Sequence, residues 1–171
     1  YLGLGGARLK AADCLHAGLA TAHVPRARLN DLVAALAGGE APQTAIGRLA
    51  TDPGPAPLAE KRAEIDRVFG AIGVEAIAAH WDLAAKSPTA LKLAFRQIRT
   101  GATLDFDACM RQEWRMVNGV IKGADFYEGV RAVVIDKDQK PKWRPATLAE
   151  VDDKVIDRHF APRPGDELEF D

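Results

Sequence analysis

The sequence contains few of the residues that usually carry nucleophilic or metal chemistry. Its two cysteines, Cys14 and Cys109, form no CxxC pair and are interpreted as reduced, buried thiols. Ser87 is the only serine, lies outside any GxSxG elbow, and is better explained by helix capping than by catalysis. The four histidines lie in no HExxH pattern and have no nearby carboxylate that would suggest a metal ligand. We therefore predict no metal site and no serine or cysteine nucleophile.

The sequence also lacks an excess of charges of one sign and a long hydrophobic run. The 23 lysines and arginines nearly balance the 24 aspartates and glutamates, and the formal net charge is −1. We therefore expect no nucleic-acid partner and no anionic membrane partner. No apolar run approaches the roughly 20 residues that span a bilayer. The 47% of apolar residues is typical of a globular domain, and a chain of 171 residues can bury a real core.

The clearest break in the sequence is the stretch 52–57, DPGPAP, in which three prolines and a glycine prevent a helix from continuing. We interpret it as a linker between residues 1–51 and a helical region at residues 58–171. Before the linker, helices are expected at 11–17, 26–37 and 42–50. Leu19–Val24 alternates apolar with small or polar residues, which predicts one short β-strand.

Beyond the linker, apolar residues recur at helical spacing over most of the chain. Helices are expected at 58–69, 74–81, 88–101 and 104–122. Ser87 and Pro88 form a strong start signal for the third of these. The longest helix carries an apolar stripe that we expect to be buried, formed by Phe106, Met110, Trp114, Val117 and Ile121. The predicted fold class is therefore mainly α.

Polar residues predict how the last third of the chain is organised. Asp125 is expected to cap a turn that follows the longest helix. Thr147 and Glu150 have the spacing of a capping box, which predicts the start of a last helix. The prolines and glycine at 162–165 lead into an acidic tail, which we expect to be loose.

One segment combines several cations with an aromatic side chain: Arg131, Lys137, Lys140, Lys142, Trp143 and Arg144. Such a loop could bind a phosphorylated, nucleotide-bearing ligand, because lysine and arginine neutralise phosphates and a tryptophan ring stacks on a base. The alternative is a solvated loop whose charges are balanced by Asp136 and Asp138 and whose tryptophan packs against the domain. The residues alone leave both interpretations open.

Three blocks of the sequence resemble a known family. Residues 125–143, DFYEGVRAVVIDKDQKPKW, resemble the C-terminal signature of the 3-hydroxyisobutyryl-CoA hydrolases. Residues 4–25 and 87–98 are similar to the wider crotonase, or enoyl-CoA hydratase/isomerase, superfamily. The resemblance covers most of the chain in register. It implies the C-terminal helical part of a crotonase-type fold, with residues 1–51 as the end of its spiral core and the strand at 19–24 as a remnant of that core.

The resemblance also implies an activity for the parent protein. Its members hydrolyse 3-hydroxyisobutyryl-CoA to 3-hydroxyisobutyrate and coenzyme A in valine degradation. Two backbone N–H groups hold the thioester oxygen, and acidic side chains assist the attacking water. In the family these groups lie upstream of the residues that match Tyr1 onward. No catalytic residue is therefore carried over, and we expect this segment to be inactive alone, with coenzyme A entering only as part of the substrate.

The same resemblance suggests which residues face coenzyme A. Lys137 occupies the position most like the superfamily lysine that approaches the phosphate end of coenzyme A. Arg131, Lys142 and Trp143 are further candidates. Val133 stands where the superfamily often has an aromatic residue, which argues against adenine stacking at that point.

Further expectations concern partners and location. The chain is expected to pack against the missing N-terminal core and to form a homo-oligomer. The expected location is the cytoplasm for a bacterial protein and the mitochondrial matrix for a eukaryotic one. Two alternatives remain, namely a fragment of an enoyl-CoA hydratase/isomerase and a helical oligomerisation or interaction module.

Overall fold

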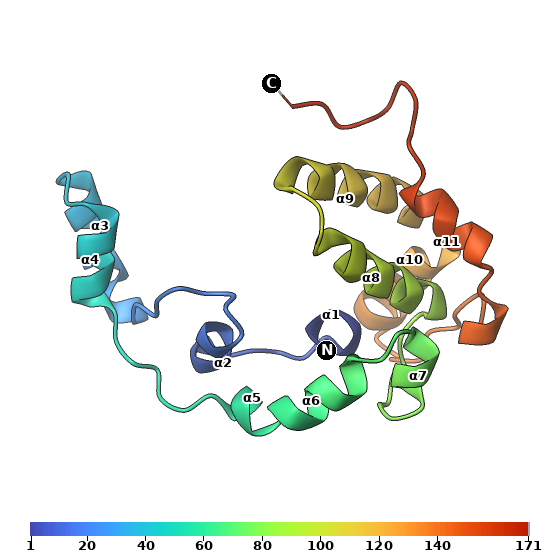
Figure 1. Ribbon diagram of the computed structural model, residues 1–171, viewed down its shortest axis with the longest axis horizontal. Coiled ribbons are helices and arrows are strands. Elements are labelled where there is room, and N and C mark those ends of the chain that lie inside the picture. Colours follow the sequence, from blue (N-terminus) through green and yellow to red (C-terminus); the bar gives the residue numbers. More distant parts are fainter. Residues whose placement is uncertain (171) are drawn as a thin grey trace. The chain divides into compact units, whose positions relative to one another are not determined.

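The computed structural model describes residues 1–170, which form helices joined by loops (Figure 1). Contacts divide the chain into two compact units. The first unit contains Tyr1–Gly6 and the residues from Val68 onward, and the second contains Ala7–Arg67. The boundary predicted at the proline-rich linker, residues 52–57, stays a prediction. Within residues 1–170, no helix combines the length and the apolar character needed to cross a membrane.

The first unit is arranged around α8, which makes contacts with α1, α7, α9 and α11. Ser87 starts α8, because its side chain accepts a hydrogen bond from the Ala90 N–H at 3.1 Å and Pro88 fits the first turn. Figure 1 shows α9 beside α8. The helices of this unit are α1 (Leu2–Gly5), α7 (Val74–Ala78), α8 (Pro88–Gly101), α9 (Phe106–Val120), α10 (Ala124–Val130) and α11 (Asp153–Phe160), with a π-helical turn at Arg131–Ile135 and a 3-10 turn at Leu148–Glu150.

Two apolar clusters lie on different sides of α8. Leu91 belongs to a cluster with Leu4, Val68, Val74, Ile77 and Leu83. Beside it, the rings of Tyr1, Phe69 and Trp81 meet edge to face at 5.3–5.4 Å. Leu93, two residues further along α8, belongs to a second cluster with Met116, Val151 and Ile156. One helix therefore serves two cores, which is why both Leu91 and Leu93 are buried.

The second unit consists of shorter helices. It contains α2 (Ala11–His16), a 3-10 turn at Arg26–Arg28, α3 (Leu29–Ala37), α4 (Pro42–Leu49), α5 (Pro57–Glu60) and most of α6 (Arg62–Phe69). The buried carboxylate of Asp13 on α2 accepts a hydrogen bond from the Leu58 N–H of α5 at 2.8 Å. On α4, Ala45 and Leu49 are fully buried.

The short strand predicted at residues 19–24 is wrong, and no β-strand forms within residues 1–170. The N–H groups of Leu19 and Ala20 bond back to the carbonyl of Cys14, as at the end of a helix. His23 alone hydrogen-bonds to another segment of the described chain: its carbonyl accepts the Thr51 N–H at 2.9 Å, and its ring Nδ1 lies 3.4 Å from the Thr51 hydroxyl. A strand needs a neighbour along its length, and this segment has none among the described residues.

The buried stripe predicted on the longest helix is also wrong. Phe106 is 74% exposed, and Val117 and Ile121 are exposed too. The buried face of α9 instead carries Met116 and Gln112, because α8 and α11 pack against that face. Gln112 is satisfied there by the Thr100 hydroxyl at 2.7 Å and the Gln97 carbonyl at 3.2 Å.

Of the other predictions for the C-terminal third of the chain, some are confirmed and others are wrong. Thr147 and Glu150 do form a capping box, although it opens a single 3-10 turn, and Asp152 caps the last helix. Gly123, not Asp125, is the N-cap of α10. The tail up to residue 170 is not loose, because it lies along α9. The Trp114 indole donates to the Asp166 carbonyl at 2.7 Å, and the Arg115 guanidinium pairs with Glu167 at 2.8 Å.

Candidate ligand-binding site

The first unit contains an apolar cavity of about 850 Å³. Its walls come from α1, α8, α10, the π-helical turn and the loop at residues 139–145. Carbon-rich side chains dominate the lining, among them Leu4, Leu91, Leu93, Phe126, Val130, Val133 and Val134. Lys86 and Arg144 add two cations to its edge. A cavity of this size and composition fits a ligand with an apolar body and an anionic end.

The loop after the π-helical turn alternates between the cavity and solvent. Gln139, Pro141 and Trp143 line the cavity, whereas Lys140 and Lys142 between them are exposed. The Trp143 indole N–H donates to the Ala85 carbonyl at 3.2 Å. Its ring lies so close to Gly129 that a Cβ there would meet Trp143 Cη2 at 3.3 Å. Trp143 is therefore a fixed part of the cavity wall.

Arg131 ties this loop to α10. Its guanidinium makes two hydrogen bonds to the Glu128 carboxylate, at 2.9 and 2.8 Å. It donates to Asp136 and Asp138 at 2.7 Å each, and to the Lys140 carbonyl at 3.2 Å. We call Arg131, Glu128, Asp136 and Asp138 the Arg131 hub. A planar arginine has five N–H donors and can serve more oxygens at once than a lysine, which has three.

Arg131 lowers the pKa of two carboxylates of the hub, Glu128 and Asp138. The Arg131 guanidinium, helped by the Lys142 backbone N–H, lowers the pKa of Glu128 to about 2. Hydrogen bonds from Arg131 and from the Lys140 N–H also lower the pKa of Asp138. The hydrogen bonds to Glu128 and then to the two aspartates raise the pKa of Arg131 further. All these groups are therefore charged at neutral pH.

The hub also supports an unusual backbone. Lys137 and Gln139 both have φ of 57°, in the left-handed region that side chains other than glycine rarely adopt. The Arg131 contacts to Asp136 and Asp138 lie on either side of Lys137, and the Gln139 N–H donates to the Ala132 carbonyl at 3.1 Å. A strained conformation persists when surrounding contacts hold it in place.

Asp125 supports the loop at its far end. One oxygen accepts the hydroxyl hydrogen of Ser87 at 2.5 Å, and the other accepts the Arg144 N–H at 2.9 Å. The residue thus joins the start of α8 to the loop and explains why its predicted capping role is taken by Gly123. The Glu128–Arg131 pair has a sequence signal, because residues three apart meet on a helix. The contact between Ser87 and Asp125 has none, because 38 positions separate them.

The four candidate coenzyme A residues have different environments. Trp143 lines the cavity, and Arg131 is engaged in the hub. Lys137 and Lys142 are exposed and make no ion pair within residues 1–170. Their contact with coenzyme A stays a prediction.

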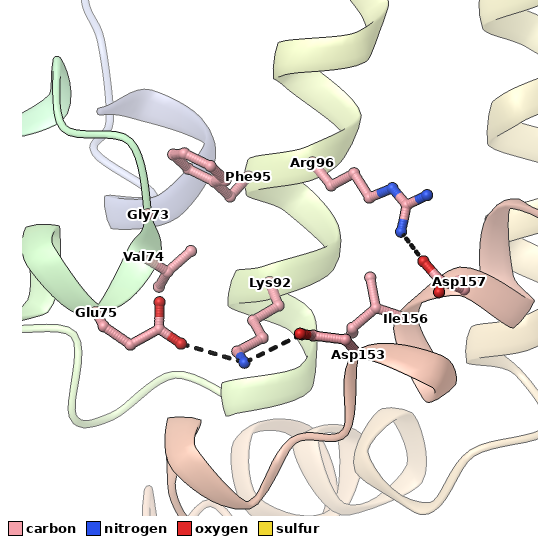
Figure 2. A pocket seen from close by; sticks show the side chains of 9 residues that line it. All are labelled: Gly73, Val74, Glu75, Lys92, Phe95, Arg96, Asp153, Ile156 and Asp157. Atoms are coloured by element: carbon pink, nitrogen blue, oxygen red, sulfur yellow. Dashed lines mark hydrogen bonds and ion pairs between the residues drawn. The ribbon is translucent and has the colours of Figure 1, made fainter.

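A second, charged cleft of about 430 Å³ lies between α7, α8 and α11 (Figure 2). Lys92, whose side chain is 17% exposed, pairs with Glu75 at 3.1 Å and Asp153 at 3.6 Å, and donates to the Val151 carbonyl at 3.3 Å. Arg96 pairs with Asp157 at 2.5 Å. The ion pairs of Lys92 and Arg96 join α8 to α7 and α11. Since both cations already have partners, the cleft offers no unpaired cation to a ligand. Within the part of the chain that the structure describes, no three metal-ligating side chains come together.

Comparison with known proteins identifies the family of the chain. The family model described as enoyl-CoA hydratase/isomerase matches residues 1–160. The mitochondrial 3-hydroxyisobutyryl-CoA hydrolase of Danio rerio is 36% identical over 94% of this chain and 48% of its own length. The Gallus gallus protein of that name is 36% identical over 99% of this chain and 50% of its own length. The probable 3-hydroxyisobutyryl-CoA hydrolase 2 of Arabidopsis thaliana is 37% identical over 94% and 50%.

Solved structures agree with the sequence relatives. A carnitinyl-CoA dehydratase from Mycobacterium thermoresistibile superposes with a TM-score of 0.83 at 31% identity, over 95% of this chain and 51% of that protein. An enoyl-CoA hydratase from Rhodobacter sphaeroides 2.4.1 gives 0.77 at 32% identity, over 99% and 52%. The chain spans about half the length of the relatives it matches. It belongs to the enoyl-CoA hydratase/isomerase family and has the helical architecture expected for part of a crotonase-type fold.

Proposed function

We propose that this chain is the substrate-binding, helical part of an enzyme that hydrolyses 3-hydroxyisobutyryl-CoA to 3-hydroxyisobutyrate and coenzyme A. The observation that carries the proposal is the 36–37% identity, over 94–99% of the chain, to hydrolases of that name from two vertebrates and a plant. These names describe the relatives themselves. Their activity is extended to this chain because the similarity covers 94–99% of it.

The chemistry of the site supports an acyl-CoA ligand. Coenzyme A joins a flexible, largely apolar arm to a nucleotide with several phosphates. The cavity of about 850 Å³ offers apolar walls for the arm. Lys137, Lys140 and Lys142 offer charge for the phosphates on the exposed side of the same loop. Trp143, on the cavity side, is fixed by its bond to Ala85 and can contact the arm without loss of side-chain freedom.

In this proposal the chemical step belongs to a part of the enzyme that this chain does not contain. Thioester hydrolysis needs preorganised donors for the developing oxyanion and a carboxylate that positions water. The carboxylates beside the cavity are already engaged: Glu128 by Arg131, and Asp125 by the Ser87 hydroxyl and the Arg144 backbone N–H. We therefore expect the 171-residue chain to bind the substrate but not to turn it over.

The test is the release of free thiol from 3-hydroxyisobutyryl-CoA. The 171-residue chain is measured beside a protein that extends the same chain upstream to the full length of its relatives. We expect turnover by the extended protein and none by the shorter one. Turnover by the shorter chain would contradict the proposal, and the catalytic groups would then be sought among its own carboxylates.

A second candidate is an enoyl-CoA hydratase, favoured by the two solved structures at 31–32% identity that carry a dehydratase and a hydratase name. The two candidates differ in product, because hydration of an enoyl-CoA releases no thiol. Loss of the enoyl absorbance of crotonyl-CoA, without thiol release, would favour the hydratase. The sequence similarity ranks the hydrolase first, at 36–37% identity.

The proposal extends to partners and location. The exposed apolar residues Phe106 and Val117 of α9, and Ile121 at its C-cap, suggest that the rest of the enzyme or a second subunit covers them. We propose the N-terminal core and a homo-oligomer as those partners. By analogy with the relatives named mitochondrial, a eukaryotic source would place the enzyme in the mitochondrial matrix, and a bacterial source in the cytoplasm.

A further inference from the structure

The segment at residues 136–144 contains more cations than acids. Its acids are Asp136 and Asp138, and its cations are Lys137, Lys140, Lys142 and Arg144. In an exposed loop, neighbouring charges of opposite sign would normally pair with one another and reduce the attraction for an added anion. The pairing found in the structure is different. Neither aspartate forms an ion pair with a lysine of the segment within residues 1–170.

Both aspartates pair with Arg131. Its guanidinium reaches each of them at 2.7 Å from the adjoining π-helical turn. The other oxygen of Asp138 accepts the Lys140 backbone N–H at 2.8 Å. Glu128, the third acid near the segment, is shared between Arg131 and the Lys142 backbone N–H at 2.7 Å. These acids therefore bond to Arg131 and to the main chain, while the three lysines are exposed and make no ion pair within residues 1–170.

We propose that Arg131 is a positioning residue that holds Asp136 and Asp138 away from the loop lysines, so that Lys137, Lys140 and Lys142 bind the phosphate-rich end of a nucleotide-bearing ligand. Arg131 does not contact the ligand in this arrangement. The inference rests on the proposed function for the nature of the ligand. It assigns to one arginine the task of keeping the cationic face of the loop free of internal partners.

The shape of the arginine side chain explains why this task needs it. Its fork serves Glu128, Asp136, Asp138 and a carbonyl together. A lysine at the same position would offer one compact charge and would release at least one aspartate. A glutamine would release both, and each could then turn to a neighbouring lysine.

The experiment measures the binding of adenosine 3′,5′-bisphosphate to the 171-residue chain by calorimetry. Three variants are compared with the unchanged chain: R131Q, the triple variant R131Q/D136N/D138N, and R48Q as the control. Arg48 also pairs with a carboxylate, Glu40 at 2.8 Å, but lies in the second unit. Circular dichroism and urea unfolding establish which variants are folded.

We expect R131Q to weaken binding roughly three- to tenfold, because two freed acids compete for the lysines. The triple variant removes these acids and should return to within about twofold of the unchanged chain, or bind more tightly. The slope of log K against log salt should fall in R131Q and recover in the triple variant, since it reports the number of phosphate-paired cations. A loss of fold alone would not produce that recovery.

Three results would overturn the inference. R131Q could bind as well as the unchanged chain, or a folded triple variant could stay as weak as R131Q, which would make Arg131 a direct ligand contact. Failure of the unchanged chain to bind the bisphosphate would also overturn it. The hydrolase proposal would survive that failure if the extended protein still released thiol from 3-hydroxyisobutyryl-CoA, so the two claims can fail separately.

Discussion

Two groups of cations in the first unit have opposite relations to the acids around them. In the charged cleft, Lys92 and Arg96 pair directly with Glu75, Asp153 and Asp157 (Figure 2). In the 136–144 loop, the acids pair with Arg131 instead, and the lysines stay exposed. Both places combine cations with acids, two cations with three acids in the cleft and four cations with two acids in the loop. We infer different functions for the cleft and the loop. Whether a cation can bind a ligand depends on whether an acid already pairs with it, not on the presence of lysine and arginine alone.

Burial explains why Lys92 is paired. The Lys92 side chain is 17% exposed, and an ammonium group so far removed from water needs carboxylate and carbonyl partners. Exposed lysines keep their hydration and need none. The cleft is therefore a structural element that should respond to mutation through stability, whereas the loop should respond through ligand binding.

Removal of the buried residue beneath the cleft should have the largest effect. Ile156 lines the cleft, is 4% exposed and packs with Leu93, Met116 and Val151. Ile156→Ala should lower the free energy of unfolding by about 2–4 kcal/mol, because it leaves a void in this cluster. Urea unfolding is the measurement. Val134→Ala is the control, since Val134 lines the apolar cavity but is 61% exposed, and a change of about 0.5 kcal/mol or less is expected. Equal losses would contradict the distinction between the two regions.

Replacement of a single lysine should reduce stability in the cleft and ligand binding in the loop. Lys92→Met keeps the aliphatic stem but leaves the Val151 carbonyl and two carboxylates without their cation, and should cost about 1 kcal/mol in urea unfolding. Lys137→Met should leave stability within about 0.5 kcal/mol. Binding of adenosine 3′,5′-bisphosphate should show the reverse order: Lys137→Met should weaken binding, and Lys92→Met should leave it unchanged. The distinction fails if both variants lose stability but neither loses binding.

Acid should weaken the Arg131 hub, because protonation of Glu128 removes the charge that Arg131 stabilises. The folded-state pKa of Glu128 is about 2, below the ordinary value of 4.5, because Arg131 and the Lys142 N–H stabilise the charged form. Its contribution to stability is therefore complete above pH 4.5 and is lost as the pH falls towards 2. E128Q should be less stable than the unchanged chain at neutral pH, and the difference in Tm should shrink over that acid range. Glu60→Gln, in the second unit, is the control for the removal of an exposed carboxylate.

Local signals predicted the helices well. Ser87 and Pro88 start α8 as expected, and Thr147 and Glu150 form their capping box, because both signals act within one turn of the chain. Helix ends shifted by a few residues, as at Ala78, where α7 ends before the expected residue 81. The expected helix at 58–69 is interrupted at Lys61 between α5 and α6.

Features that depend on distant residues were not predictable from the sequence. The apolar stripe of α9 has the right spacing for burial, but α8 and α11 occupy the face of Gln112 and Met116 instead. The strand at 19–24 has a suitable alternation and lacks a partner among the described residues. The acidic tail appeared loose because only the structure brings Trp114 and Arg115 beside residues 166–167.

The candidate site illustrates the same limit. The cationic segment was evident from its composition, and the Glu128–Arg131 pair follows from helical spacing. One interpretation of the sequence has Asp136 and Asp138 balance the lysines, but the structure pairs both with Arg131. The binding loop stays a proposal, and the contacts that support it lie between residues whose pairing the sequence leaves open.

The most direct test of the account compares two thioesters of 3-hydroxyisobutyrate in the full-length enzyme, one of coenzyme A and one of N-acetylcysteamine, which lacks the nucleotide. If this chain binds the nucleotide end, kcat/KM should strongly favour the coenzyme A thioester, and K137M/K142M should reduce that preference mainly through KM. Equal kcat/KM for the two thioesters, or a preference that the double variant leaves intact, would contradict the claim that the exposed lysines of this loop bind the substrate.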